Sequence, residues 1–452
     1  MPEDTTKDAD DVKAAQRPNF LSDLIRRFGR RNPRASGLVK MAESLISERG
    51  EASGVALASE LLTGYDALAA DEKLRFLQML SDQFGPDPER LERAIVQYRA
   101  TQSAAAAGAL HAAAEPRRQE VIRRLNLAPG GTGKLVAMRE NVLAHLPKVP
   151  GLAPLDADFV HLFSSWFNRG FLVLRRIDWA TPAHVLEKII RYEAVHEISS
   201  WDDLRRRIQP ADRRCFAFFH PALADEPLIF VEVALTEGVP GAIGPLLAEQ
   251  RRSMDPHRAS TAVFYSISNC QDGLRGVSFG NFLIKQVVEE LKRDLPSLRT
   301  FVTLSPIPGF MPWLKMERDK PDSEHLSAED RQTLSDLDRT AWHRDAVTAA
   351  RLRPVLLSAL ARYFFKARTA SGRVIDPVAR FHLGNGARLE QFNWLGDPSP
   401  KGLAQSAGMM VNYLYDPRHI EQNHEDFVKN GEVAAAGSLR KLLRGSRSSN
   451  GR

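Results

Sequence analysis

Three short segments of this chain contain residue types that could do chemistry. The first, APGGTGKL (residues 128–135), is similar to the glycine-rich loop that binds nucleotide phosphates. The match fails at two positions, because Ala128 stands where that loop needs a glycine and Leu135 stands where a hydroxyl should bind magnesium. No strand is predicted before the segment, so we interpret it as a turn followed by the start of a helix.

The second segment, GVSFG (residues 276–280), has the G-x-S-x-G pattern of the nucleophile elbow in hydrolases. That elbow places its serine directly after a strand, whereas the strand TAVFYSIS is expected to end here at Ser268. Another interpretation uses the same glycines in a loop between a strand and a helix. Free backbone N–H groups and the helix dipole at such a loop suit a pyrophosphate, and we favour this interpretation over a hydrolase.

The third segment, LSPIPGF (residues 304–310), directly follows the predicted buried strand TFVT. Pro306 and Pro308 remove backbone donors and fix φ, so we expect strand pairing to stop there and the sheet to open beside Ser305. His382, in ARFHLGNG, belongs to the residue type that can give and regain a proton near neutral pH. A buried structural histidine is the alternative for such an apolar context.

Composition limits the class of protein that can contain these segments. The 452 residues are enough for about two to three domains. No apolar run is long enough to cross a membrane, and the segment MPEDTTKDADD is unlike a targeting signal. Cys215 and Cys270 form no metal-binding or disulfide pattern, which favours a cytoplasmic protein. The net charge of +6 is scattered, with denser basic stretches at residues 202–214 and at the tail. This pattern by itself leaves nucleic acid binding open and suits a polyphosphate ligand as well, and our prediction is no nucleic acid partner.

The elements that must position these residues change in character along the chain. Residues 1–16 are expected to be a disordered tail and residues 17–155 a helical domain for scaffolding or oligomerisation, with Asp71 and Asp87 as helix N-caps. Residues 156–440 are expected to form a mixed-sheet α/β catalytic domain, followed by a basic flexible tail at 441–452. We predict strands at 171–177, 215–220, 228–235, 261–268 and 300–304, helices at 182–195, 280–295 and 346–365, and an exposed insertion at 315–339. The predicted fold class is therefore α+β.

The loop RGVSFG (residues 275–280) resembles the R/Q-x-x-G-x-G/A pyrophosphate loop of GNAT-type acyltransferases, which bind coenzyme A, and departs from it at Ser278. Three further segments are FVTLSPIPGF (301–310), FHLGNGARLEQFNWLGD (381–397) and GLAQSAGMMVNYLY (402–415). Taken together, residues 159–415 resemble the malonyl-CoA decarboxylase family. The preceding helical region is similar to the N-terminal domain of that family.

The resemblance implies a GNAT-like catalytic domain that converts malonyl-CoA to acetyl-CoA and carbon dioxide without metal or other cofactor, in fatty acid or malonate metabolism. It places the catalytic serine at Ser305, as proton acceptor, and the catalytic histidine at His382, as proton donor to an enolate. The implied CoA-binding residues are Arg275, Gly276, Val277, Ser278, Phe279, Gly280 and Asn281. It also implies a homo-oligomer, either a tetramer or a dimer.

A free hydroxyl holds its proton too tightly to act as an independent base, so our hypothesis is that Ser305 binds the malonyl carboxylate or orients His382. Other polar residues are weaker candidates for contacts with substrate: Asn385, Asn393, Asn412, Ser266, Ser268, Tyr265, His220 and Lys285. Two other functions stay open, a GNAT-type acyl-CoA N-acyltransferase and a non-catalytic acyl-CoA sensor.

Overall fold

The structure is a computed structural model that describes residues 34–47, 51–277 and 283–443. The chain divides into two compact units, of which the first ends at Leu162 and the second begins at Phe163. The predicted boundary between residues 155 and 156 stays a prediction. The predicted tail at 1–16 and most of the predicted tail at 441–452 lie outside the described residues.

The first unit is built of helices whose apolar residues recur at helical spacing. Asp87 is the N-cap of α5 as predicted, since its carboxylate accepts the Arg90 N–H at 2.8 Å. The prediction for Asp71 is wrong, because α4 begins at Ala70 and Asp71 lies inside its first turn, where an acidic side chain favours the helix dipole. The helices are α2 (Ala35–Ile46), α3 (Glu51–Asp66), α4 (Ala70–Gln83), α5 (Pro88–Thr101), α6 (Ala104–Ala114), α7 (Arg117–Asn126), α8 (Gly131–His145) and α9 (Ala153–Trp166), the last of which continues into the second unit.

The segment similar to a phosphate-binding loop is a turn followed by a helix, as predicted. Gly130 has φ of +69°, and α8 begins at the next residue. The side chain of Lys134 forms an ion pair with Asp66 at 2.9 Å. Its ammonium group therefore serves a surface contact between two helices.

The second unit contains an eight-stranded mixed sheet with the order β1-β2-β3-β4-β5-β8-β6, and β7 pairs with β8. Only the β4–β5 pair is parallel among the strand pairs of the described residues. The strands are β1 (Val173–Ile177), β2 (Arg213–His220), β3 (Leu223–Thr236), β4 (Thr261–Asn269), β5 (Thr300–Thr303), β6 (Ser305–Pro306), β7 (Arg388–Asn393) and β8 (Met410–Leu414). All five predicted strands are present, and the predicted α+β class is confirmed.

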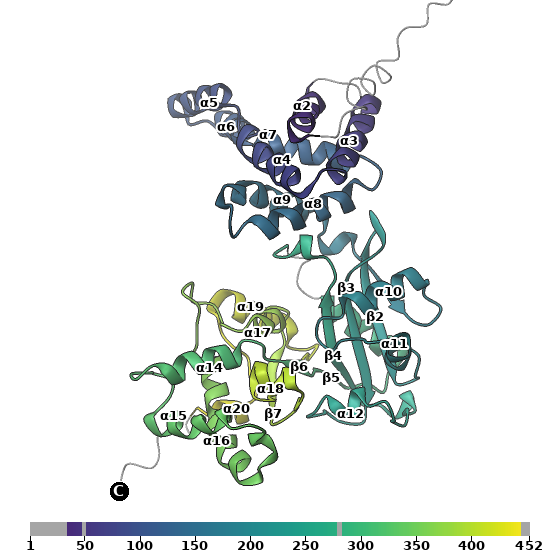
Figure 1. Cartoon of the computed structure of the whole chain (residues 1–452), viewed down its shortest axis with the longest axis vertical. Helices are drawn as coiled ribbons and strands as arrows, with labels where there is room; N and C mark the ends of the chain where they lie inside the picture. The colour runs from purple at the N-terminus through teal and green to yellow at the C-terminus, as the bar shows by residue number, and fades with distance from the viewer. Residues whose placement is uncertain (1–33, 48–50, 278–282, 444–452) are drawn as a thin grey trace, which may run out of the picture. The chain divides into compact units, whose positions relative to one another are not determined.

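Some helices of this unit pack on the sheet, and others, in the C-terminal part of the chain, pack against one another (Figure 1). These helices are α10 (Ala183–Tyr192), α11 (Trp201–Ile208), α12 (Gly244–Leu247), α13 (Leu283–Asp294), α14 (Phe310–Asp319), α15 (Ala328–Leu334), α16 (Ala346–Phe365), α17 (Pro377–Gly384), α18 (Pro400–Ser406), α19 (Ile420–Asn430) and α20 (Gly437–Lys441). Helices α10 and α11 pack apolar side chains such as Leu186 and Leu204 against Phe219 and Phe230 of the sheet, forming one of its cores. The predicted helix at 346–365 matches α16 at both ends.

The interpretation of residues 315–339 as an exposed insertion is wrong in its middle. Helix α15 begins there with a capping box. The Ser327 side chain accepts the Asp330 N–H, and the Asp330 side chain accepts the Ser327 N–H. Leu326 and Leu334 are buried, and Asp330 forms an ion pair with Arg362 of α16 at 3.2 Å. Although the segment contains many charged residues, these two buried leucines and the ion pair hold it against α16.

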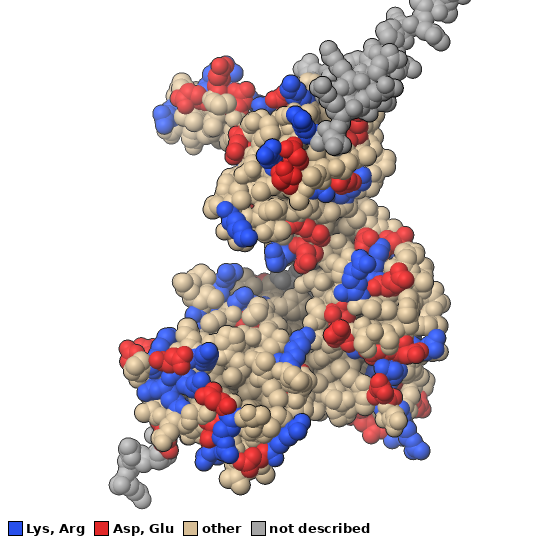
Figure 2. Space-filling view, viewed as in Figure 1, with Lys and Arg blue, Asp and Glu red and all other residues tan. Residues whose placement is uncertain are grey.

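Charged side chains of both signs are mixed on the face shown in Figure 2. Near α15 and α16, for example, Arg351 lies against Asp336, and Arg318 pairs with Asp338 at 3.0 Å. None of the helices in the described part of the chain has the length and hydrophobicity required to cross a bilayer.

Candidate active site

Ser305 lies where the central sheet divides. Parallel pairing of β5 with β4 ends at Thr303 opposite Phe264, followed by one bond from the Leu304 N–H to the Phe264 carbonyl at 2.9 Å. Beyond it the chain leaves β4, but β6 still pairs with β8. The predicted opening of the sheet is thus confirmed beside β4. The expectation that pairing stops at the prolines is wrong beside β8, because Pro306 can lie at the end of a short edge strand without donating a hydrogen bond.

His382 lies in the last turn of α17 and is only 3% exposed. The carboxylate of Asp376 accepts the Ala379 N–H at 2.8 Å as an N-cap, and Pro377 occupies the first helical turn. Asp and Pro favour a helix start at these positions. They set where the helix begins and so bring the imidazole to Ser305, with His382 Nε2 at 3.2 Å from Ser305 Oγ.

Two tyrosines from β8 and the residue just after it hold the imidazole. The Tyr413 ring stacks on it, with 4.4 Å between ring centroids and 28° between planes, and the Tyr415 hydroxyl lies 2.8 Å from His382 Nδ1. Neither tyrosine was predicted as a site residue. Their alternation in NYLY indicates that they share one side of an extended segment, but the sequence does not show that this segment lies beside Ser305.

The hydrogen bonds around Ser305 have a direction. Its hydroxyl donates to Thr303 Oγ1 at 2.8 Å, and Thr303 Oγ1 also accepts the Tyr413 N–H at 3.2 Å. With its proton directed to Thr303, Ser305 Oγ is left to accept from His382. We therefore assign the proton of the neutral imidazole to Nε2, so that Nδ1 accepts from the Tyr415 hydroxyl.

Burial lowers the pKa of His382 from 6.5 to about 3, because the imidazolium ion would lose its hydration. Burial also raises the pKa of Tyr415 well above its usual value. Both groups are therefore neutral near pH 7, in agreement with the assigned hydrogen-bond pattern.

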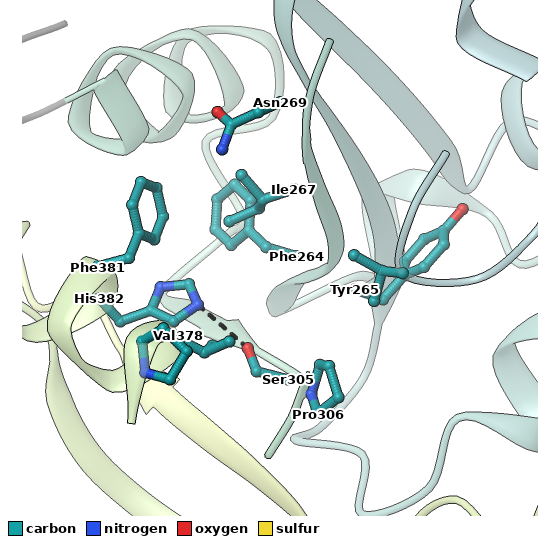
Figure 3. Close-up of a pocket in the computed structure, with 11 residues that line it drawn as sticks. Phe264, Tyr265, Ile267, Asn269, Ser305, Pro306, Val378, Phe381 and His382 are labelled. Carbon is teal, nitrogen blue, oxygen red and sulfur yellow. Dashed lines mark hydrogen bonds between the residues drawn. The ribbon is translucent and has the colours of Figure 1, made fainter. Parts of the chain in front are cut away.

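Ser305 and His382 face a cavity of about 230 Å³, shown in Figure 3. The described residues that line it include no Lys, Arg, Asp or Glu. The lining residues are Val195, Phe264, Tyr265, Ile267, Asn269, Ser305, Pro306, Pro377, Val378, Phe381 and His382. The Tyr265 ring turns away from the Ser305–His382 pair. An anion that entered would meet a small number of hydrogen-bonding groups in an otherwise apolar space.

The predicted CoA loop falls only partly within the described residues. Ser278, Phe279, Gly280 and Asn281 lie outside them. Gly276 has φ of +80°, a conformation that glycine adopts without strain. Together with Arg275 and Val277 it lines a second cavity, of about 340 Å³, which shares Asn269 and Phe381 with the first. The two cavities are therefore adjacent.

Two of the asparagines considered from the sequence have structural partners instead. Asn412 donates to the Thr303 carbonyl at 2.7 Å and accepts from Asn393 at 2.7 Å. These bonds connect β5, β7 and β8 next to Ser305, and neither side chain lines the Ser305 cavity. Asn385, by contrast, lines the second cavity.

The remaining candidates from the sequence lie apart from the Ser305–His382 pair. Ser266 and Ser268 donate to the Glu193 carboxylate at 2.6 and 3.4 Å. His220 ends β2 as predicted, with Nε2 at 3.1 Å from the Trp166 carbonyl. Lys285 forms an ion pair with Glu421 at 2.9 Å.

Cys215 and Cys270 are both buried free thiols, and burial raises the pKa of each. In residues 34–47, 51–277 and 283–443, no group of His, Cys, Asp and Glu side chains is arranged to hold a metal ion.

The helical region, the mixed sheet that opens at one serine and the adjoining glycine-containing loop are the features expected of the malonyl-CoA decarboxylase family. Comparison with known families gives the same family. Residues 170–452 match the model of the malonyl-CoA decarboxylase C-terminal domain, and residues 84–167 match that of the N-terminal domain. The chain belongs to the malonyl-CoA decarboxylase family.

Solved structures and curated relatives agree with this assignment. A malonyl-CoA decarboxylase from Rhodopseudomonas palustris is 61% identical, with a TM-score of 0.88, and the match covers 90% of this chain and 99% of that one. A second, from Agrobacterium vitis, is 58% identical with a TM-score of 0.86 over the same shares. The mitochondrial malonyl-CoA decarboxylase of the goose Anser anser anser is 36% identical over 81% of this chain and 79% of its own length.

Proposed function

We propose that this protein decarboxylates malonyl-CoA to acetyl-CoA and carbon dioxide, with Ser305 and His382 acting on the malonyl group. The observation that carries the proposal is the buried Ser305–His382 contact of 3.2 Å in an apolar cavity, next to a second cavity beside Arg275. This arrangement suits a substrate with a small reactive end and a large anionic end.

The lining of the first cavity favours loss of carbon dioxide. A malonyl carboxylate that enters it leaves water and finds no cation among the described lining residues. Because the negative charge is concentrated in the carboxylate and spread over carbon and the thioester oxygen once carbon dioxide leaves, an apolar site disfavours the starting state more than the enolate. Hydrogen-bond donors at the cavity wall then stabilise the enolate oxygen.

His382 supplies the proton that the reaction consumes. The C–C bond to the carboxylate breaks, its electron pair moves to the α-carbon and the thioester oxygen, and the Nε2–H proton of His382 passes to the α-carbon. A neutral imidazole suffices as the donor, since a thioester enolate is a stronger base than the imidazolate anion that remains after the transfer. The imidazolate regains its proton from water when the products leave, and the hydroxide that forms is released with them.

Ser305 holds the donor proton towards the cavity. Its oxygen accepts the Nε2–H in the free protein while its own proton is directed to Thr303. When substrate is bound, the Ser305 hydroxyl can turn to the malonyl carboxylate. We thus propose a hydrogen-bonding role for Ser305 rather than that of an independent base.

The test is incubation of the purified protein with malonyl-CoA alone. We expect release of carbon dioxide and acetyl-CoA at an unchanged rate with a chelator present, as the proposed reaction uses no metal or other cofactor. Turnover only with an amine acceptor would identify an N-acyltransferase, and tight binding without turnover would identify an acyl-CoA sensor. Either result would overturn the proposal.

Variants then test the two residues. His382→Gln should lower kcat by about 100- to 10,000-fold, the range expected for loss of a general acid. Ser305→Ala should lower kcat more than it raises KM, and a change in KM alone would contradict the assigned role. Ser268→Ala is the matched control, since it also removes a buried hydroxyl but lies outside the cavity lining. The predicted dimer or tetramer would be tested by sedimentation.

A further inference from the structure

The second cavity has two walls of different origin. One wall is the segment after β4, with Gln271, Asp272 and Arg275. The other is α17, with Arg380, Phe381 and Gly384, and the residue after it, Asn385. Among the described residues that line the cavity, two side chains are cationic and one, Asp272, is anionic. A guanidinium on each wall favours a ligand that carries several negative charges.

Arg380 is held in place by its own chain. Its Nη1 donates to the carbonyl oxygens of Val374 at 2.8 Å and Ile375 at 2.9 Å, just before the N-cap Asp376. These bonds occupy one nitrogen of the guanidinium. In the described part of the chain, no carboxylate lies within ion-pair distance of Arg380, whereas Lys285 already pairs with Glu421. The positive charge of Arg380 is thus anchored but without a salt-bridge partner.

The position of the cavity identifies the part of the substrate that it would take. It shares Asn269 and Phe381 with the cavity of Ser305 and His382. A thioester whose reactive end contacts Ser305 would therefore extend its arm past Phe381 into the second cavity. The first strongly charged group that follows the arm of a CoA thioester is its diphosphate.

We propose that Arg380 binds the diphosphate of the CoA thioester, opposite Arg275. This inference rests on the proposed function for the identity of the ligand. Arg380 lies two residues before His382 in the same helix, so one helix carries a group for each end of the substrate. A charge-assisted bond between a guanidinium and a phosphate is among the strong hydrogen bonds of proteins.

The experiment compares malonyl-CoA with malonyl-pantetheine, which has the same reactive end and no phosphate. Arg380→Gln should raise KM for malonyl-CoA by about 10- to 100-fold and leave kcat/KM for malonyl-pantetheine within about twofold. Equal losses with both substrates would show that Arg380 only supports the start of α17, and would overturn the proposal. Arg373→Gln is the control, since Arg373 is an exposed arginine outside the cavity lining.

Malonyl-dephospho-CoA, which lacks the 3′-phosphate but keeps the diphosphate, tests the assignment within the ligand. The Arg380→Gln effect should persist with this substrate, and its disappearance would place Arg380 at the 3′-phosphate and refute the diphosphate assignment. Calorimetric binding of CoA and of pantetheine requires no turnover. Weaker binding of CoA alone in the variant would support the inference even if the decarboxylase proposal failed.

Discussion

The protonation state of His382 leads to the most direct test of the site. A pKa lowered from 6.5 to about 3 corresponds to about 5 kcal/mol in favour of the neutral imidazole. We therefore expect kcat/KM to be flat between pH 5 and pH 7.5. If His382 had an ordinary pKa of 6.5 and were active only when neutral, kcat/KM would fall about 30-fold between pH 7.5 and pH 5.

The substrate for this measurement is malonyl-pantetheine, since it has no phosphate that titrates in this range. Its kcat/KM reports the free protein and the free substrate. A decrease with an apparent pKa between 6 and 7 would refute the effect of burial on His382. An increase towards low pH would show that the imidazolium ion is the active form, and would refute the neutral donor. Brief transfer to each pH from a neutral stock separates these effects from unfolding.

The same burial affects stability. The folded state holds His382 neutral down to about pH 3, whereas the unfolded chain binds a proton on it below about pH 6.5. The unfolded state therefore binds more protons between these values, and this histidine should lower the free energy of unfolding as the pH falls from 6.5 towards 3. Denaturant unfolding of wild type and His382→Gln at pH 7 and pH 5 should show a free energy of unfolding that depends less on pH in the variant. An equal pH dependence in the two proteins would contradict the lowered pKa of His382.

Three further variants test the residues that hold the pair. Thr303→Val removes the acceptor of the Ser305 proton and leaves the buried Tyr413 N–H without an acceptor, so kcat should fall about 2- to 12-fold and the free energy of unfolding by about 1–3 kcal/mol. Thr303→Ser should retain most of the activity and stability, and equal behaviour of the two variants would argue against a role for the Thr303 hydroxyl. Tyr415→Phe removes the donor to Nδ1 and frees the imidazole to change tautomer, so kcat should fall about 5- to 100-fold with little change in KM, and an unchanged kcat would contradict the tautomer assigned to His382. Asp376→Ala should lower the free energy of unfolding by about 1–3 kcal/mol through loss of the α17 N-cap, whereas Asp376→Asn should keep the cap and most of the activity, and similar thermal shifts for both variants would show that the cap contributes little.

Local pattern was sufficient for most elements of the fold. The five predicted strands, β1 to β5, are runs rich in β-branched and aromatic residues, whereas β6, β7 and β8 were not predicted, and α16 is an amphipathic run whose ends match the prediction. The prediction for the segment 315–339 is wrong because its charges are frequent and only two leucines, eight residues apart, are buried in it. A helix stabilised by a few anchors has little periodic signal in its sequence.

Some residues of the candidate site were likewise predicted from the sequence, and others are recognised only in the structure. Ser305 and His382 were predicted from family resemblance, and the opening of the sheet at Ser305 from the chemistry of proline. Thr303, Tyr413 and Tyr415 were not predicted, because their roles depend on the pairing of strands that are more than one hundred residues apart in the chain. Which hydroxyl donates to which atom is likewise a property of the folded neighbours.

The sequence by itself therefore determined the residue types, the order of most elements and the point at which the chain separates from β4. These follow from local sterics, periodicity and the missing N–H of proline. Only the tertiary structure decided that His382 is neutral, that its Nε2 faces Ser305 and that Arg380 shares a cavity with Arg275. The physical reason is that burial, hydrogen-bond direction and cavity lining arise from contacts between segments distant in sequence, and these contacts exist only once the chain has folded.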